Sequence, residues 1–165
     1  MSRFQATETL LAAMAGQHPG FPPQASAIVR MVKLLYKLTQ DQGNELLRRY
    51  GLTYPEYNAL MMLSASSEGV LSPSQLGDAI AEKSANVTRL TTQLVEKHLI
   101  ERAPSVQDRR MWLLRLTPQG EALIASFMPE ISMQLLGYVR RLEKAEQTQL
   151  LDLLKRLLAG VEEGA

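Results

Sequence analysis

The sequence predicts a mainly α-helical fold with a small β-hairpin. Leucine and methionine are plentiful, whereas aromatic residues make up only 5% of the 165 residues, and this composition favours helices. Apolar residues recur at helical spacing along most of the chain, and a strand-like pattern replaces that spacing only between residues 99 and 116. Because this length suffices for one sizeable core but not for two ordinary enzyme domains, we expect one compact domain with extensions.

The first third of the chain predicts an arm and two helices. Residues 1–23 contain the stretch HPGFPP, which cannot sustain a helix, so we expect an arm. A long helix is expected over about residues 24–51, because apolar residues recur on one face and a glycine stands at its end. Thr53 with Glu56 three positions later is a capping-box signal, and it predicts a second helix over about residues 55–65.

Two further helices follow, joined by a short link. Ser72 with Gln75 is another capping-box pair, which predicts a helix over about residues 73–81. Ser84 can cap the next helix, which we term the reading helix, and its apolar residues recur at helical spacing on one face. The link of two residues is as short as DNA-reading helix pairs require, so the sequence predicts a helix-turn-helix.

A basic hairpin follows the reading helix. Residues 99–102 and 111–116 have the pattern of two short strands joined by a loop. From Lys83 to Arg115 the chain has seven basic and three acidic residues, a local charge of +4 (seven minus three), whereas the whole chain carries +1. Basic charge is therefore concentrated where it could neutralise phosphates. The helix pair and this hairpin together predict a winged helix-turn-helix DNA-binding lobe over residues 53–117.

The C-terminal part is expected to return to helix from Gln119, to be interrupted at Pro129 and to end in a leucine-rich amphipathic helix. A terminal helix with so many leucines needs a partner surface, either within the chain or across a twofold axis. We favour the second arrangement, in which residues 1–50 and 119–165 supply the dimerisation helices and the arm of a homodimer.

Several functional classes lack the residues they require. The chain has no cysteine, so it can form neither a disulfide framework nor a thiolate nucleophile. Its only histidines, His18 and His98, accompany no metal-ligand cluster or nucleophile motif, so we expect no enzyme, no metal and no cofactor. The sequence shows neither a signal-peptide pattern nor a run of about 18 consecutive apolar residues, so we expect a cytoplasmic protein with no membrane partner.

Over roughly residues 28–160 the chain resembles the MarR family of bacterial transcription factors. The matching segments are VTRL at 87–90, LVEK at 94–97, LIER at 99–102, DRR at 108–110 and LTPQG at 116–120. The arm and the start of the reading helix are similar to the branch that includes repressors of multidrug efflux pumps. Ala81 and His98 stand where the family often has glycine. The resemblance implies a ligand-responsive repressor that binds a pseudo-palindromic double-stranded DNA operator as a homodimer.

The candidate DNA-binding residues lie on the helix pair and the hairpin. Polar side chains on the exposed face of the reading helix match base edges and phosphates, and two arginines at a hairpin tip suit the narrow minor groove. The full set is Ser72, Ser74, Lys83, Ser84, Asn86, Thr88, Arg89, Thr92, Gln93, Arg102, Asp108, Arg109 and Arg110. The resemblance implies that Arg110 enters the minor groove while Asp108 helps to hold the wing in shape. An ordinary solvated surface is the alternative for these residues, as helix capping is for Ser72.

The resemblance also implies an effector site, in which a small aromatic or phenolic ligand, often an acid, binds between the dimerisation helices and the DNA-binding lobe. The matching region contains tyrosines and methionines, which can line an adaptable apolar pocket, and two basic residues that could balance a carboxylate. The candidates are Arg30, Lys33, Tyr36, Tyr57, Met61 and Met62. Plain core and surface charge are the alternatives for these residues. A winged-helix module that binds protein instead of DNA is the alternative function.

Overall fold

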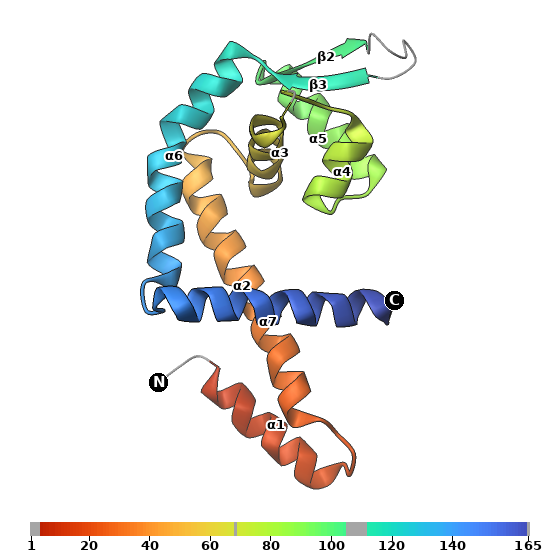
Figure 1. Ribbon diagram of the computed structural model, residues 1–165, viewed down its shortest axis with the longest axis vertical. Helices are drawn as coiled ribbons and strands as arrows, with labels where there is room; N and C mark the ends of the chain where they lie inside the picture. The colour runs from red at the N-terminus through yellow and green to blue at the C-terminus, as the bar shows by residue number, and fades with distance from the viewer. Residues whose placement is uncertain (1–3, 68, 105–111, 165) are drawn as a thin grey trace.

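The computed structural model describes residues 4–67, 69–104 and 112–164. In chain order its elements are α1 (Gln5–Gln17), α2 (Pro23–Arg48), α3 (Tyr54–Ala65), β1 (Val70–Leu71), α4 (Pro73–Ile80), α5 (Ser84–Glu96), β2 (Ile100–Pro104), β3 (Trp112–Leu116), α6 (Pro118–Val139) and α7 (Lys144–Glu163). Helices α3, α4 and α5 and the sheet gather into a lobe at one end, and α2 and α6 run side by side away from it (Figure 1). The predicted mainly α fold with a winged helix-turn-helix is confirmed.

The lobe is built around leucines supplied by every one of its helices and by the sheet. Leu60 of α3, Leu76 of α4, Leu94 of α5 and Leu114 of β3 are all fully buried in one cluster. The sheet is antiparallel with strand order β1-β3-β2, so the predicted hairpin has a third strand that sequence analysis did not identify. Only two residues of β1 pair with β3, which is too short a run to give a periodic signal.

The predicted helix starts agree with the observed caps at all but one position. The backbone N–H of Thr53 donates to Glu56 Oε2 at 2.8 Å, which is half of the expected capping box. Ser72 and Gln75 form the second box. The prediction for Ser84 was wrong: Lys83 occupies the N-cap position of α5, and Ser84 is the first helical residue.

The N-terminal arm contains a helix that the sequence analysis did not predict. Residues 5–17 form α1, which folds back against α2 (Figure 1). Its Leu11 is only 3% exposed. The HPGFPP stretch ends α1 and turns the chain, as its prolines and glycine predict. The prediction was wrong only in extending the non-helical arm over the residues that form α1.

The predicted interruption at Pro129 was also wrong, since α6 runs unbroken through that residue. Pro129 is exposed, whereas Phe127 and Ile131 beside it are buried and hold both halves of the helix against the lobe. Helix α6 is long and apolar enough to cross a membrane by length and composition, although a core helix of a soluble protein passes the same test. Sequence analysis found no such segment because polar residues interrupt the apolar run.

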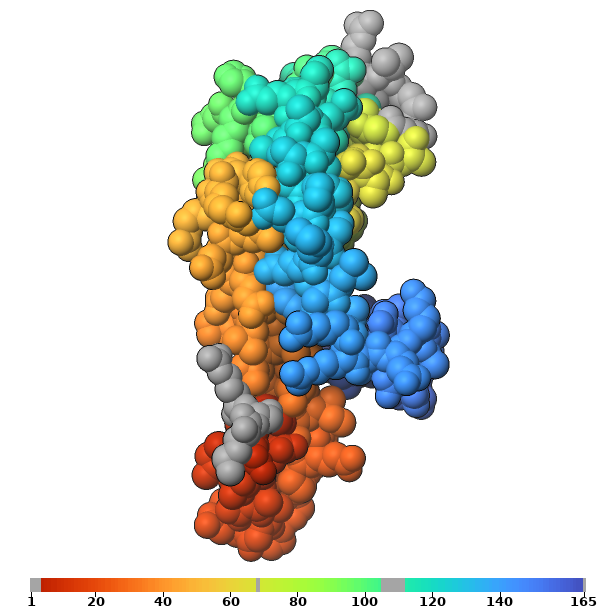
Figure 2. All heavy atoms as spheres, turned by 90° about the vertical axis from the view of Figure 1, so that its left-hand side faces the viewer, coloured from red at the N-terminus to blue at the C-terminus, as the bar shows by residue number. Residues whose placement is uncertain are grey.

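Helix α7 lies apart from the rest of the chain. Figure 2 shows it standing out from the column formed by α2 and α6. None of its residues is buried, and several of its leucines are about half exposed, including Leu150 at 44%, Leu154 at 42% and Leu158 at 56%. The leucine-rich face predicted for this helix is therefore uncovered in the single chain.

Candidate nucleic-acid interface

The two faces of α5 have opposite environments. Val87, Leu90 and Leu94 are at most 5% exposed and hold the helix against the lobe. The predicted polar residues of α5, namely Ser84, Asn86, Thr88, Arg89, Thr92 and Gln93, are all exposed on the remaining surface. The helix therefore presents one continuous polar face to solvent, whereas the contacts of these residues with DNA stay a prediction.

Two threonines on that face have already used their hydroxyl protons. Thr88 Oγ1 donates to the carbonyl oxygen of Ser84 at 3.0 Å, and Thr92 Oγ1 donates to that of Thr88 at 2.9 Å. A hydroxyl has one proton to donate and two lone pairs. In this arrangement both side chains can offer only an acceptor or a methyl group to a ligand.

Arg102 connects the first wing strand to the reading helix. Its Nη2 atom lies 2.9 Å from both Thr91 Oγ1 and Thr92 Oγ1 and donates to them. Sequence analysis predicted a phosphate contact here, and the structure adds a packing role, because the guanidinium ties β2 to the middle of α5. The remaining N–H groups of this exposed side chain are the ones that could reach a phosphate.

The other predicted DNA contacts lie around this face. Ser74 and Lys83 are exposed at the starts of α4 and α5, whereas the Ser72 hydroxyl accepts the Gln75 backbone N–H at 3.2 Å. The capping alternative for Ser72 is therefore observed. The wing-tip residues Asp108, Arg109 and Arg110 lie outside the described residues, and their role stays a prediction.

The structure does not gather the predicted effector residues into one site. Tyr57 lines a cavity of about 210 Å³, and Tyr36 lines a separate one of about 200 Å³. Met61 is half-buried against the lobe core, and Met62 is 36% exposed on α3. Arg30 and Lys33 are exposed on α2 and line neither cavity. Helical phase places the members of the set on different faces, and their role in ligand binding stays a prediction.

The cavity that contains Tyr57 lies between α2, α3 and α6, and tyrosines that the sequence analysis overlooked contribute to it. Tyr54 and Tyr138 line it together with Ile131 and Leu135. Positions 131, 135 and 138 are spaced by four and three residues, so helical periodicity along α6 could have placed Tyr138 on this face. Burial raises the pKa of Tyr57 and of Tyr138, with a further contribution from Tyr54, so both phenols are protonated donors at neutral pH.

Comparison with known proteins agrees with this architecture. Residues 52–111 match the model of the MarR family. The transcriptional repressor MprA of Escherichia coli is 26% identical over 98% of this chain and 92% of its own length. The chain is therefore similar to the MarR family over residues 52–111 of its sequence. A MarR/EmrR family transcriptional regulator from Acinetobacter sp. ADP1 superimposes with a TM-score of 0.71 at 25% identity, over 85% of this chain and 96% of that one.

A protein of similar fold has also been solved with DNA. The S. aureus MepR–DNA complex matches this chain with a TM-score of 0.75 at 21% identity, over 80% of this chain and 96% of that one. This likeness shows a shared fold.

Two turns of the chain have the backbone conformation that glycine favours but are formed by other residues. Ala81, which ends α4, has φ 55°, and His98, which follows α5, has φ 58°. These are the two positions where the family often has glycine, and both backbones adopt the left-handed conformation that glycine favours.

Proposed function

We propose that this chain is a transcriptional repressor that binds a pseudo-palindromic DNA operator as a homodimer. The observation that carries the proposal is the exposed polar face of α5, which a buried apolar face holds outward beside the wing strands. A helix with such a face fits the major groove, where each base pair presents a distinct set of donors and acceptors. MprA is named a transcriptional repressor and MepR was solved with DNA, which supports the same activity here.

The dimer follows from apolar surface that one chain leaves uncovered. Leu150, Leu154 and Leu158 recur every four residues along α7, and Leu135 and Leu136 of α6 are 54% and 68% exposed. Soluble monomers seldom expose such contiguous apolar surface. A second copy related by a twofold axis covers it and places two α5 helices about 34 Å apart, one turn of the DNA. Changing Leu154 to Glu is expected to give a monomer with weak operator binding.

The effector part of the proposal rests on the cavity between α2, α3 and α6. Its volume of about 210 Å³ suits a single aromatic ring, since drug-sized ligands occupy about 300–1,000 Å³. Its walls are mainly apolar, with Thr39 and Gln134 as polar members, and Tyr57 and Tyr138 carry hydroxyl groups that can donate hydrogen bonds to a ligand oxygen. We expect benzoate or phenol to weaken operator binding, and Tyr57→Phe to reduce that effect. Saturating amounts of both probes that leave operator affinity unchanged would remove this part of the proposal.

Two experiments test the proposed DNA binding. The first selects bound fragments from random DNA, and the second measures the affinity for the best fragment at a series of salt concentrations. We expect log affinity to fall with log salt at a slope of about −0.9 per phosphate neutralised. Arg89→Ala is expected to weaken binding to the selected fragment. A chain that enriches no sequence and shows no salt dependence would instead support the protein-binding alternative.

A further inference from the structure

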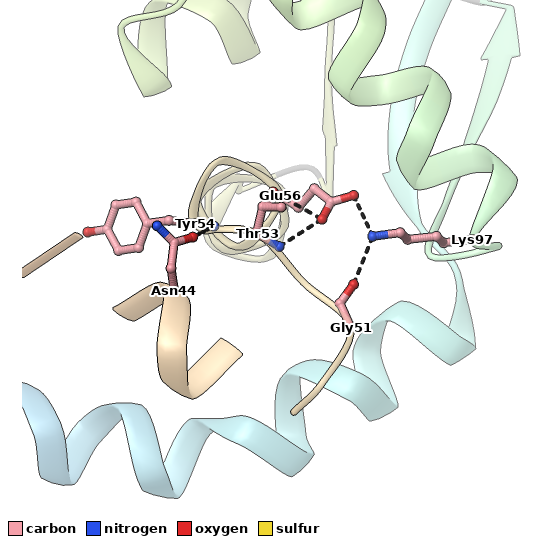
Figure 3. A network of polar contacts seen from close by, with 6 residues as sticks. All are labelled: Asn44, Gly51, Thr53, Tyr54, Glu56 and Lys97. Atoms are coloured by element: carbon pink, nitrogen blue, oxygen red, sulfur yellow. Dashed lines mark hydrogen bonds and ion pairs between the residues drawn. The ribbon is translucent and has the colours of Figure 1, made fainter. Parts of the chain in front are cut away.

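The side chain of Lys97 joins the end of the reading helix to the start of α3 and to the turn that precedes it. Its Nζ atom donates to Glu56 Oε1 at 2.6 Å and to the carbonyl oxygen of Gly51 at 2.8 Å (Figure 3). The second carboxylate oxygen of Glu56 accepts the backbone N–H of Thr53 at 2.8 Å. Both oxygens of this carboxylate are thus satisfied, and Lys97 spends two of its three protons on the contact.

The pair is unusual because one of its members is buried. Glu56 is only 2% exposed, whereas the side chain of Lys97 is 40% exposed. Burial acts to raise the pKa of Glu56, but the Lys97 ammonium and the Thr53 hydrogen bonds outweigh it and lower that pKa. A carboxylate buried at this depth stays charged only while its cation is in place.

The location of the contact gives it a mechanical role. Gly51 belongs to the turn that ends α2, and Asn44 of α2 accepts the backbone N–H of Tyr54 at 2.8 Å (Figure 3). The end of α2 and the first turn of α3 are therefore held together, and Lys97 attaches the C-terminal end of α5 to both. A shift of the end of α2 relative to the lobe therefore acts on this contact, as it does on Leu47 of α2, which is buried in the same core cluster as Leu94 of the reading helix.

We propose that Lys97 is a positioning residue that fixes the separation of the two reading helices in the DNA-bound dimer. The proposal rests on the proposed function, because it requires a dimer that reads two half-sites. Helix α5 has 13 residues and is therefore about 20 Å long. A small tilt about its C-terminal end displaces the exposed residues near its start, such as Asn86 and Arg89, more than any others. Loss of the contact leaves each lobe folded but lets the two helices accept more than one separation.

The test compares operators whose half-sites are moved apart or together by one base pair, a shift of about 3.4 Å along the duplex. The wild-type dimer is expected to prefer the natural spacing strongly. Lys97→Met is expected to bind the natural operator somewhat less well and the shifted ones relatively better, so that the preference falls about tenfold, or about 1.4 kcal/mol. Lys97→Arg, which keeps the charge and the reach to Glu56, should restore the preference.

Lys37→Met is the matched control, because it removes the same charge and an exposed ion pair with Asp41 that lies within one helix. It should leave the spacing preference unchanged. The double variant Glu56→Gln with Lys97→Met leaves no unpaired buried charge, and glutamine keeps the capping box, so this variant replaces Lys97→Met if the single variant fails to fold.

Two results would overturn the proposal. One is a Lys97→Met or double variant with the wild-type spacing preference. The other is a uniform loss of affinity at every spacing with a salt slope about one unit shallower, which would identify Lys97 as a phosphate contact. Failure of the wild-type chain to select any DNA is a different outcome, because it would remove the proposed function itself.

Discussion

The side-chain amide of Asn86 donates a hydrogen bond of 2.8 Å to Glu82 Oε2, from the first turn of the reading helix back to the link that precedes it. A carboxylate can only accept, so the nitrogen of the amide must face Glu82 and its oxygen is left for other partners. The bidentate contact of an asparagine with adenine needs both amide atoms. The bond to Glu82 uses one of the two N–H groups of Asn86 and fixes the orientation of its amide.

Glu82→Ala is therefore expected to change base preference at one position in each half-site. Loss of Glu82 leaves the amide free to turn toward a base edge, and a bidentate contact with adenine is worth about 1–3 kcal/mol of discrimination. Sequencing of DNA selected from a random library measures the preference at every position. Asp78→Ala removes an exposed acid of α4 and should raise affinity generally without changing the preferred base. An identical preferred sequence for Glu82→Ala and wild type would contradict the role assigned to this hydrogen bond.

Replacement of Ala81 by glycine is expected to stabilise the fold. Ala81 holds φ 55° at the end of α4, and a non-glycine residue pays about 1–2 kcal/mol in that conformation. Glycine loses more backbone freedom on folding, so the net gain should be about 0.5–1 kcal/mol in the free energy of unfolding. Chemical denaturation measures this difference.

Ala85→Gly provides the control for this variant. Ala85 is exposed in the first turn of α5 and lies in an ordinary right-handed helix. Glycine there should lower the free energy of unfolding by up to about 1 kcal/mol. If Ala81→Gly and Ala85→Gly both lower the free energy of unfolding, the left-handed conformation of Ala81 costs no more than the backbone freedom that glycine loses on folding.

These turns illustrate how far the sequence could predict the fold. Signals confined to a few neighbouring residues, such as the capping boxes that begin at Thr53 and Ser72, gave the correct helix starts because the groups that form them are local. Val70 pairs with Arg115, which lies 45 positions later in the chain (115 minus 70). A strand of two residues is too short to show an alternating pattern in the sequence, so this pairing could not be predicted. Pro129 gave a false break, since tertiary packing of its buried neighbours overrides the local preference.

The candidate sites divide in the same way. The polar face of α5 follows from helical period alone, so its exposed residues were predictable one by one. The cavity beside Tyr57 takes its lining from three helices. Its α6 residues follow the helical period, but no local pattern connects them to the lining residues of α2 and α3. Lys97 and Glu56 were noticed in sequence only as part of a family-like segment and as a helix cap, and their contact joins residues 41 positions apart.

The stability contributed by Glu56 should depend on pH. Its folded-state pKa is lowered below the ordinary value of 4.5, so the contribution is fully present above that value and is lost as pH falls through the folded-state pKa. Glu56→Gln should remove this part of the acid dependence, and the free energies of unfolding of the two chains should converge as pH falls below 4.5. Denaturation curves at a series of pH values measure it. A constant difference across the acid range would show that Glu56 titrates alike in both states.

The junction between the wing and α6 should tolerate no side chain at Gly120. A Cβ atom there would lie 2.1 Å from the carbonyl oxygen of Leu99, which accepts the backbone N–H of Thr117 at 3.1 Å. Gly120→Ala must therefore push β2 and the start of α6 apart, and overpacking of this kind costs about 1–3 kcal/mol.

Gly160 of α7 has nothing within 4 Å of its Cβ position, so Gly160→Ala should stabilise that helix by up to about 1 kcal/mol. Thermal unfolding of the two variants measures the contrast, and equal stability would mean that the junction yields without cost. Because α6 begins where the wing ends, we also expect Gly120→Ala to weaken operator binding under conditions in which the chain remains folded.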